Sequence, residues 1–259
     1  MAHKIAVANQ KGGVGKTTTS INLASAIALT GCRTLLVDLD PQAHATLGLG
    51  YDKREIRRSV YDAMVEENVP PGMLLNGKVP NLDLLPANIA LAGSEVELVS
   101  LPDREVRLRR TLATVDADYG HILIDCPPSL GLLTLNALAA ADAVLIPVQC
   151  EYYAIEGLSR LLETINIVRQ TLNPTLELEG VVLTMYSSRL NLAQQVVSEV
   201  KNYFGAKVFA TVIPRNVRLA EAPSFGKSIF QYEPSSLAAL AYRTLGEELL
   251  RRRTTEPVS

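Results

Sequence analysis

Residues 9–18 form a glycine-rich run, Asn-Gln-Lys-Gly-Gly-Val-Gly-Lys-Thr-Thr, between a short apolar stretch and a helical pattern. A strand, a glycine loop and a helix in this order are typical of a phosphate-binding P-loop. Glycines let the backbone curl so that its N–H groups point at phosphate oxygens, and the helix amino terminus adds its positive dipole end. The run therefore predicts an α/β fold that holds a nucleotide at the carboxyl edge of a parallel sheet.

The residue types within this run indicate separate roles. Lys16 is expected to reach the β- and γ-phosphates, and the Thr17 hydroxyl is expected to bind magnesium. The strict P-loop pattern has glycine where this chain has Gln10, and the chain carries an additional lysine, Lys11. A glycine-rich turn that binds nothing is the alternative, but such a run arises by chance in about one in 10,000 chains of this length. The predicted nucleotide-binding residues of the loop are Lys11, Gly12, Gly13, Val14, Gly15, Lys16, Thr17 and Thr18.

Acidic residues end two of the apolar stretches. Asp125 ends one of them, and Asp38 and Asp40 end or follow another. An acid at a strand end is often only a turn former or a helix cap. Because the carboxyl ends of adjacent parallel strands converge on the nucleotide, such an acid can also hold the magnesium shell. Thr17, Asp40 and Asp125 are therefore the predicted magnesium residues, and ATP and Mg²⁺ are the predicted ligands.

Strand and helix signals alternate along the chain, with no repeat, low-complexity tract or linker between them. Continuous apolar strands separated by helices predict a mainly parallel sheet with helices on both faces, in a single doubly wound α/β domain over residues 1–250. Residues 51–77 are expected to form an irregular surface excursion, and the polar tail 251–259 is expected to be disordered. The predicted strands are 4–9, 33–38, 81–85, 121–125, 143–148 and 180–184, and the predicted helices are 17–29, 132–140, 155–170, 192–203 and 237–250.

The composition narrows the class of protein. Hydrophobic residues make up 47% and charged residues 20% of the chain, which is typical of a soluble globular protein. No apolar run reaches the roughly 18 residues that span a bilayer, and the amino terminus lacks a signal peptide. Three widely spaced cysteines and three scattered histidines argue against a disulfide framework or a metal cluster. A reducing, cytoplasmic compartment is expected.

The net charge of −2 is distributed unevenly. Between Val181 and Phe230 there are six basic residues and two acidic ones, so this stretch nets +4 and the rest nets −6. Charge alone fits a solvated face with chance clustering as well as it fits a nucleic-acid surface. The six basic residues are Arg189, Lys201, Lys207, Arg215, Arg218 and Lys227.

Together these motifs resemble the ParA/Soj family of chromosome- and plasmid-partitioning ATPases, within the deviant-Walker P-loop group that includes MinD. The resemblance extends from Ile5 to about Leu250. Besides the loop at 9–18 it rests on Val-Asp-Leu-Asp-Pro-Gln at 37–42, Ile-Asp-Cys-Pro-Pro-Ser-Leu-Gly-Leu-Leu-Thr at 124–134, Pro-Val-Gln-Cys-Glu-Tyr-Tyr-Ala at 147–154 and Val-Ile-Pro-Arg-Asn-Val-Arg-Leu-Ala-Glu-Ala-Pro at 212–223.

The resemblance implies a role for the additional lysine. Lys11 would cross to the nucleotide of a partner subunit in an ATP-bound homodimer, and Asp40 would position the attacking water, so that Lys11, Lys16 and Asp40 are the implied catalytic residues. Slow ATP hydrolysis, non-specific binding to double-stranded DNA, stimulation by a ParB-type partner and a nucleoid-associated location are implied as well. The residues implied to lie beside the adenine are Pro214, Arg215 and Asn216, and those implied to bind DNA are Arg189 and Arg218, with Lys201, Lys207 and Lys227 as weaker candidates.

The chain departs from the family pattern just after Asp40. Ala43 and His44 occupy positions that usually hold glycine and asparagine. His44 either alters this loop and its pH response or is a harmless surface histidine. The P-loop begins at residue 9, which leaves no room for the amino-terminal helix-turn-helix of many plasmid relatives, so operator-specific repression is not expected.

Two alternatives to a DNA-binding ATPase come from related P-loop proteins. A MinD-like membrane ATPase needs a carboxyl-terminal helix with an apolar face, whereas residues 251–259 carry charge but almost no apolar side chains, so no membrane contact is expected. A redox enzyme that holds an iron–sulfur cluster between subunits needs two suitably placed thiolates. Cys126 and Cys150 lie within family motifs and are interpreted as small buried apolar residues.

Overall fold

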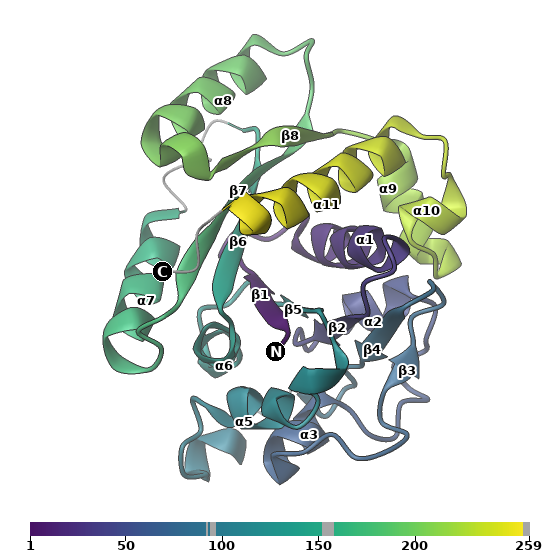
Figure 1. Ribbon diagram of the computed structural model, residues 1–259, viewed down its shortest axis with the longest axis vertical. Coiled ribbons are helices and arrows are strands. Elements are labelled where there is room, and N and C mark those ends of the chain that lie inside the picture. The colour runs from purple at the N-terminus through teal and green to yellow at the C-terminus, as the bar shows by residue number, and fades with distance from the viewer. Residues whose placement is uncertain (92, 94–96, 152–157, 256–259) are drawn as a thin grey trace.

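The computed structural model contains a β-sheet with helices on both faces (Figure 1). It describes residues 1–91, 93, 97–151 and 158–255. Within these residues the sheet has eight strands in the order β3-β4-β2-β5-β1-β6-β7-β8, and every neighbouring pair except β3–β4 is parallel. The prediction of a mainly parallel, doubly wound α/β fold is confirmed. The strands are β1 (His3–Val7), β2 (Thr34–Asp38), β3 (Leu75–Asn76), β4 (Leu82–Leu85), β5 (His121–Asp125), β6 (Ala143–Gln149), β7 (Glu177–Tyr186) and β8 (Val208–Pro214).

Each face of the sheet has its own hydrophobic core, because successive strand residues point to opposite faces. In β1, Ile5 and Val7 belong to one core and Ala6 belongs to the other. Burial on both faces explains the continuous apolar strands and leaves the strand ends as the place for polar groups. The first core includes α1 (Lys16–Leu29), α2 (His44–Gly48), α10 (Ile229–Tyr232) and α11 (Leu237–Thr255), and the second includes α3 (Val60–Glu66), α5 (Arg107–Ala113), α6 (Leu132–Ala140), α7 (Ser159–Thr171) and α8 (Asn191–Phe204).

Most predicted elements are present, some with shifted ends. The strand at 121–125 and the helix at 132–140 have the predicted bounds. The predicted helix at 155–170 corresponds to α7, and its residues 155–157 lie outside the described part of the chain. Strand β8 was not predicted, although its sequence Val-Phe-Ala-Thr-Val-Ile-Pro is mostly apolar; it lies at the edge of the sheet and has register shifts against β7.

Two predictions about irregular regions are wrong. Residues 51–77 contain α3, which begins with a capping box between Ser59 and Asp62 and places Met64, fully buried, in the core. The tail predicted to be disordered from residue 251 begins as helix, since α11 continues to Thr255. Arg252 supports this extension by donating 2.8 and 2.9 Å hydrogen bonds to Glu248 and to the carbonyl oxygen of Val208. Residues 256–259 lie outside the described range.

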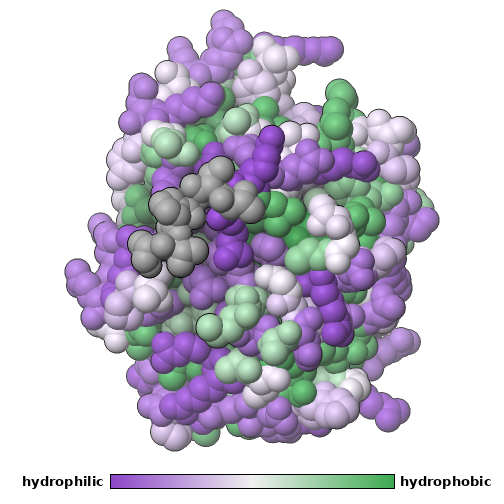
Figure 2. Space-filling view, viewed as in Figure 1, coloured by the Kyte–Doolittle hydropathy of each residue, from purple (hydrophilic) through white to green (hydrophobic). Residues whose placement is uncertain are grey.

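The surface gives no sign of a large apolar area on the face drawn in Figure 1. Figure 2 shows mostly hydrophilic side chains there, with apolar ones in scattered groups. Scattered apolar side chains are ordinary on protein surfaces. Among the described residues, no helix is both long enough and apolar enough to cross a bilayer.

Candidate nucleotide-binding site

The loop between β1 and α1 has the backbone shape of a phosphate-binding loop. Gly13 and Gly15 have φ angles of 76° and 88°, in the left-handed region that side chains disfavour. A Cβ atom at Gly12 or Gly13 would meet no atom within 4 Å, so open space surrounds these positions. Gly15 also caps the start of α1. The glycines are therefore required for the curl of the loop, which leaves the first N–H groups of α1 for an anion.

Two neighbouring strands, β6 and β7, hold the loop in place. Thr184 in β7 donates a 2.8 Å hydrogen bond from Oγ1 to the carbonyl oxygen of Val14. Asn9 donates from Nδ2 to the carbonyl oxygen of Pro147 in β6 at 2.7 Å and accepts from the N–H of Lys11 at 3.0 Å. Neither Asn9 nor Thr184 was predicted as a site residue. In the sequence, each of the two is marked only by being a polar residue at the end of a predicted apolar strand.

Lys16 is a buried cation at the start of α1. It is only 7% exposed, and its Nζ donates a 3.1 Å hydrogen bond to the carbonyl oxygen of Lys11. Burial lowers the pKa of Lys16, and the nearby charge of Asp125 acts in the opposite direction. Because a positive charge held out of water is stabilised by an anion, this position fits a phosphate group.

Two buried acids lie side by side where β2 and β5 end, since Asp38 and Asp125 pair in the strand register. Asp38 accepts 2.7 Å hydrogen bonds from the N–H and the hydroxyl of Thr46, and burial raises the pKa of Asp38 to about 6. Asp125 accepts a 2.8 Å hydrogen bond from Ser20 through Oδ1. Its other oxygen is buried and has no hydrogen-bond partner among the described residues. Burial, and then the neighbouring charge of Asp38, raise the pKa of Asp125 to about 8.

The unpaired oxygen of Asp125 is the observation that tests whether a metal ion fits here. A buried carboxylate oxygen without a partner is uncommon, and an oxygen ligand of this kind suits Mg²⁺ or a water in its shell. The described residues contain no group of three or more His, Cys, Asp or Glu that could hold a metal ion by themselves. This agrees with Mg²⁺, which binds through one or two protein oxygens together with substrate phosphates and water.

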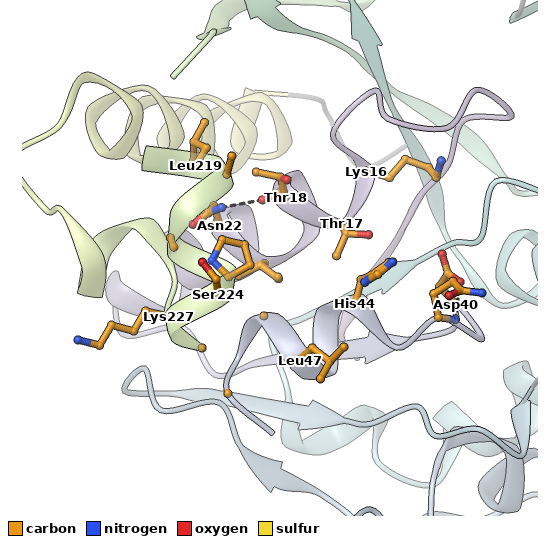
Figure 3. A pocket seen from close by; sticks show the side chains of 18 of the residues that line it. Lys16, Thr17, Thr18, Asn22, Asp40, His44, Leu47, Leu219, Ser224 and Lys227 are labelled. Carbon is orange, nitrogen blue, oxygen red and sulfur yellow. Dashed lines mark hydrogen bonds between the residues drawn. The ribbon is translucent and has the colours of Figure 1, made fainter. Parts of the chain in front are cut away.

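A pocket of about 1270 Å³ lies beside the loop, between α1, α2 and residues 219–227. Figure 3 shows Lys16, Thr17 and Asp40 at one end of this pocket and Leu219 at the other. Asp40 is 7% exposed, and its Oδ1 accepts a 2.8 Å hydrogen bond from the N–H of Gln42. The structure therefore brings the predicted phosphate and magnesium residues together at one end of the pocket, which is also lined by Gly12, Gly13, Gly15 and Thr18.

Lys11, in contrast, is not among the residues that line the pocket. Its Nζ lies 3.3 Å from Oε2 of Glu151, and the two side chains are 41% and 46% exposed. Glu151 also lies 3.9 Å from a guanidinium nitrogen of Arg215. Ion pairs that are half exposed to water are weak. Lys11 is therefore held loosely, outside the pocket of its own subunit.

The predicted adenine-contacting residues lie at the end of β8. Arg215 donates its N–H to the carbonyl oxygen of Tyr186 at 2.9 Å, and Asn216 caps the short helix α9 (Val217–Glu221). Pro214, Arg215 and Asn216 are not among the residues that line the pocket, whose wall there contains Leu219 and Met185 instead. Their contact with a base stays a prediction.

The predicted DNA-binding residues lie on separate elements of the carboxyl-terminal half. Arg189 precedes α8, Lys201 lies in the last turn of α8, and Lys207 lies in the 3-10 helix Gly205–Lys207. Arg218 in α9 pairs with Glu221 at 2.8 Å. All are exposed except Lys207, which is partly buried, and Lys227 also lines the nucleotide pocket. Their part in DNA binding stays a prediction.

A glycine loop, a buried lysine and a buried acid at the carboxyl edge of a parallel sheet define a P-loop nucleotide-binding protein. A family model described as an AAA domain matches residues 2–178. The chain is 56% identical to the sporulation initiation inhibitor protein Soj of Bacillus subtilis, over 96% of this chain and 98% of that protein. It is 54% identical to the chromosome partitioning protein ParA of Myxococcus xanthus, over 96% of this chain and 88% of that protein.

The structure is also similar to a solved structure of a cobyrinic acid a,c-diamide synthase from Mycobacterium smegmatis with bound ADP and magnesium. The TM-score is 0.87 at 40% identity, and the match covers 98% of this chain and 96% of that one. With more than half of the residues shared with Soj over almost the whole of both chains, this chain belongs to the ParA/Soj family of ATPases. The resemblance inferred from the motifs is confirmed.

Proposed function

We propose that this chain is a chromosome- or plasmid-partitioning ATPase that binds DNA as an ATP-bound homodimer and releases DNA after hydrolysis. The placement of the two loop lysines carries the proposal. Lys16 is buried in its own pocket, whereas Lys11 lies outside that pocket on a weak ion pair with Glu151. A second subunit that closes over the pocket would offer Lys11 a stronger partner, the phosphates of its nucleotide.

The ligands of the pocket are ATP and Mg²⁺. When bound, Mg²⁺ neutralises charge that develops on the phosphates during hydrolysis. Thr17 and Asp125 are the residues that would hold it, Asp125 through the oxygen that accepts no hydrogen bond from the described part of the chain. Lys16 binds the β- and γ-phosphates, and Asp40, which lines the same end of the pocket, orients the attacking water. We also retain Pro214, Arg215 and Asn216 as neighbours of the adenine, next to Leu219.

The DNA-binding part of the proposal rests on the basic stretch between Val181 and Phe230. Exposed arginines and lysines bind phosphates without reading sequence, and such binding weakens steeply with salt. A dimer doubles the basic surface, which gives a physical reason for binding only in the ATP state. The proposed contacts are Arg189 and Arg218, with weaker ones from Lys201, Lys207 and Lys227. A ParB-type protein is the proposed partner that stimulates hydrolysis, in the cytoplasm on the nucleoid.

Co-sedimentation with double-stranded DNA tests this switch. Wild type and Asp40→Ala are compared with ATP, with ADP and without nucleotide, each at two salt concentrations. We expect binding only with ATP, stronger at low salt, and a persistent DNA-bound state for Asp40→Ala because hydrolysis no longer ends it. DNA binding that is the same in all nucleotide states would contradict the proposal.

A further inference from the structure

A second cavity lies between the edge strand β8 and the outward side of α11, which run side by side in Figure 1. Its volume is about 830 Å³, and none of the residues that line it also lines the nucleotide pocket. The proposed ATP cycle therefore gives this cavity no role. This α11 groove is bordered by Val212 and Pro214 on β8 and by Leu237, Leu240 and Thr244 on α11.

The apolar side chains of the groove are unusually open to water. Leu237 and Leu240 are 72% and 59% exposed. The opposite side of α11 places Tyr242, Leu245 and Leu249 in the first core, and a helix with one buried face usually has polar side chains elsewhere. Single exposed leucines are ordinary, but leucines that border an apolar groove mark a place where a partner can remove them from water.

The edge of β8 is closed to an added strand where it borders the groove. Glu248 accepts hydrogen bonds of 2.8 and 2.9 Å from the N–H groups of Ala210 and Thr211, and one of 2.7 Å from the Thr211 hydroxyl. Because these N–H groups already have an acceptor, an extended peptide would not gain hydrogen bonds from them. A helix satisfies its own backbone, so a helix is the form of peptide that this edge admits.

The charged side chains of the groove all lie toward the carboxyl end of α11. They are Glu248, Arg251 and Arg252, so two arginines and one acid give this end a formal net charge of +1. Glu248 pairs with Arg252 at 2.8 Å, and Arg251 is exposed. Among the described residues, no charged side chain lines the other end, where Leu237 and Leu240 lie. The groove therefore complements an apolar segment that carries carboxylates at one end.

The same asymmetry disfavours a second copy of this chain as the occupant. Two α11 helices related by a two-fold axis pack either antiparallel or parallel. The antiparallel arrangement sets Arg251 of one copy against Leu237 of the other, which removes a charge from water against an apolar side chain. The parallel arrangement sets the two Arg251 side chains together, so that like charges repel. A bilayer is disfavoured as well, because a flat surface would leave the groove unfilled.

We propose that the α11 groove is a docking site for an amphipathic, acidic helix of a partner protein. The apolar face of that helix packs on Leu237 and Leu240, and its acidic residues lie at the end that faces Arg251 and Arg252. Burial of the leucines supplies affinity, and the charges at one end set the direction in which the helix lies. The groove is separate from the nucleotide pocket, so this binding can be measured without nucleotide.

The probe is a library of helical peptides of about 15 residues, which matches the part of α11 that borders the groove. Each peptide has leucine at positions i, i+3, i+4 and i+7, and Glu, Gln or Lys elsewhere. Without nucleotide, wild type should enrich peptides with Glu at one end by about tenfold over Leu240→Asp. Arg251→Glu should shift the preference at that end from Glu to Lys. Ile167→Asp is the matched control, since Ile167 is 57% exposed on α7, and it should select the same peptides as wild type.

Thermal unfolding is the folding control, and the four proteins should unfold at similar temperatures because all three substituted side chains are exposed. Equal enrichment on wild type and Leu240→Asp, enrichment on neither, or selection without a preference for Glu would overturn the proposal. Sedimentation velocity without nucleotide and co-sedimentation with phosphatidylglycerol vesicles test the other two occupants. Self-association or vesicle binding that Leu240→Asp abolishes would overturn the proposal in favour of a second copy or a bilayer. Because no step uses ATP or DNA, failure here leaves the proposed function standing.

Discussion

The two edges of the parallel sheet both carry charged side chains, but these side chains differ in the partners that they have within the chain. At the amino edge, Lys4 pairs with Asp116 at 2.7 Å, and the charge of Glu179 lies 2.8 Å from Nε2 of His3, in hydrogen-bond contact. At the carboxyl edge, one oxygen of Asp125 is buried without a hydrogen bond from the described residues, and Lys16 has a carbonyl oxygen in place of a carboxylate. Charged groups that stabilise the fold are paired with other residues of the chain. Charged groups that bind a ligand keep atoms free for hydrogen bonds or ion pairs with that ligand.

This difference has a consequence for stability. An unpaired buried charge destabilises the protein until its ligand binds. Residues of the carboxyl edge are therefore expected to promote ligand binding and to lower the stability of the ligand-free protein. Residues of the amino edge are expected to affect stability alone. Substitutions at the two edges should therefore move binding and stability in different combinations.

The largest expected effect is that of Lys16→Ala at the carboxyl edge. Removing the buried cation should weaken ATP binding by about 100-fold or more, because it deletes charge-assisted hydrogen bonds between a buried lysine and the phosphates. Titration with a fluorescent ATP analogue measures this loss. Thermal unfolding without nucleotide is the control, and the variant should be at least as stable as wild type. A variant that unfolds earlier yet binds ATP normally would place Lys16 among the structural residues.

At the same edge, Asp125→Asn should abolish Mg²⁺-dependent hydrolysis and raise the stability of the nucleotide-free protein. The folded-state pKa of Asp125, about 8, lies above its value in the unfolded chain. Its contribution to stability is therefore fully present below about pH 4 and is lost as the pH rises through about 8. We expect the nucleotide-free variant to be about 2 kcal/mol more stable than wild type at pH 8, as measured by urea unfolding, and to lose Mg²⁺-dependent hydrolysis. Equal stability of the two proteins from pH 5 to pH 8 would contradict the assignment of a buried charge.

Much of the carboxyl edge could be predicted from the sequence, because its residues follow from local rules. Gly15 needs its backbone conformation, Lys16 follows the glycines, and Asp125 ends a buried strand, so each carries a signal in its immediate neighbours. The partners that hold these residues could not be predicted. Thr184 reaches the loop from 170 positions away, and Ser20 reaches Asp125 across 105 positions.

The rest of the fold shows the same limit. Most strands were recognised as apolar runs, but the edge strand β8 was missed although its sequence is mostly apolar; its residues 210–212 are more exposed than Val208 and Phe209. The helix α3 was missed within an irregular stretch, although the Ser59–Asp62 capping box was a local signal for it. The amino edge was not predicted at all, since an ion pair such as Lys4–Asp116 depends on the sheet order.

At the amino edge, His121 differs from the paired residues because one of its ring nitrogens is buried without a hydrogen bond from the described residues. Substituting His121 therefore tests the comparison between the two edges. Its Nδ1 lies 3.3 Å from the Cys32 sulfur, but its Nε2 is buried without a hydrogen bond from the described residues. Burial lowers the pKa of His121 to about 4. A histidine whose pKa is lower in the folded state contributes stability that is present above its unfolded pKa of about 6.5 and is lost as the pH falls toward 4.

We therefore expect wild type to lose roughly 1–2 kcal/mol of unfolding free energy between pH 7 and pH 5, and the His121→Gln variant to lose less. Urea unfolding at both pH values, without nucleotide, measures the difference. ATP binding at pH 7 is the control and should be the same in both proteins. If ATP affinity falls with the substitution, the separation of the two edges is incomplete.

The smallest expected effect concerns Lys11. Like the charged residues of the amino edge, Lys11 has a partner within the chain, but this ion pair is weak. Its partner Glu151 lies at 3.3 Å, and both side chains are about half exposed, so the pair contributes about 0.2–1 kcal/mol. In the proposed dimer this pair must break before Lys11 can reach the second nucleotide. Glu151→Gln should therefore strengthen ATP-dependent dimerisation by about two- to fivefold. The measurement is sedimentation equilibrium with ATP in an Asp40→Ala background, in which hydrolysis does not deplete the dimer.

Glu163→Gln is the matched control, since it removes the same charge from an exposed position on α7 and should leave dimerisation unchanged. The effect of Glu151→Gln should also shrink at high salt, because screening weakens a half-exposed ion pair in wild type. A weaker dimer in Glu151→Gln would mean that Glu151 acts within the dimer interface. The Lys11–Glu151 pair would then not have to break on dimerisation, and the proposed transfer of Lys11 to the second nucleotide would be wrong.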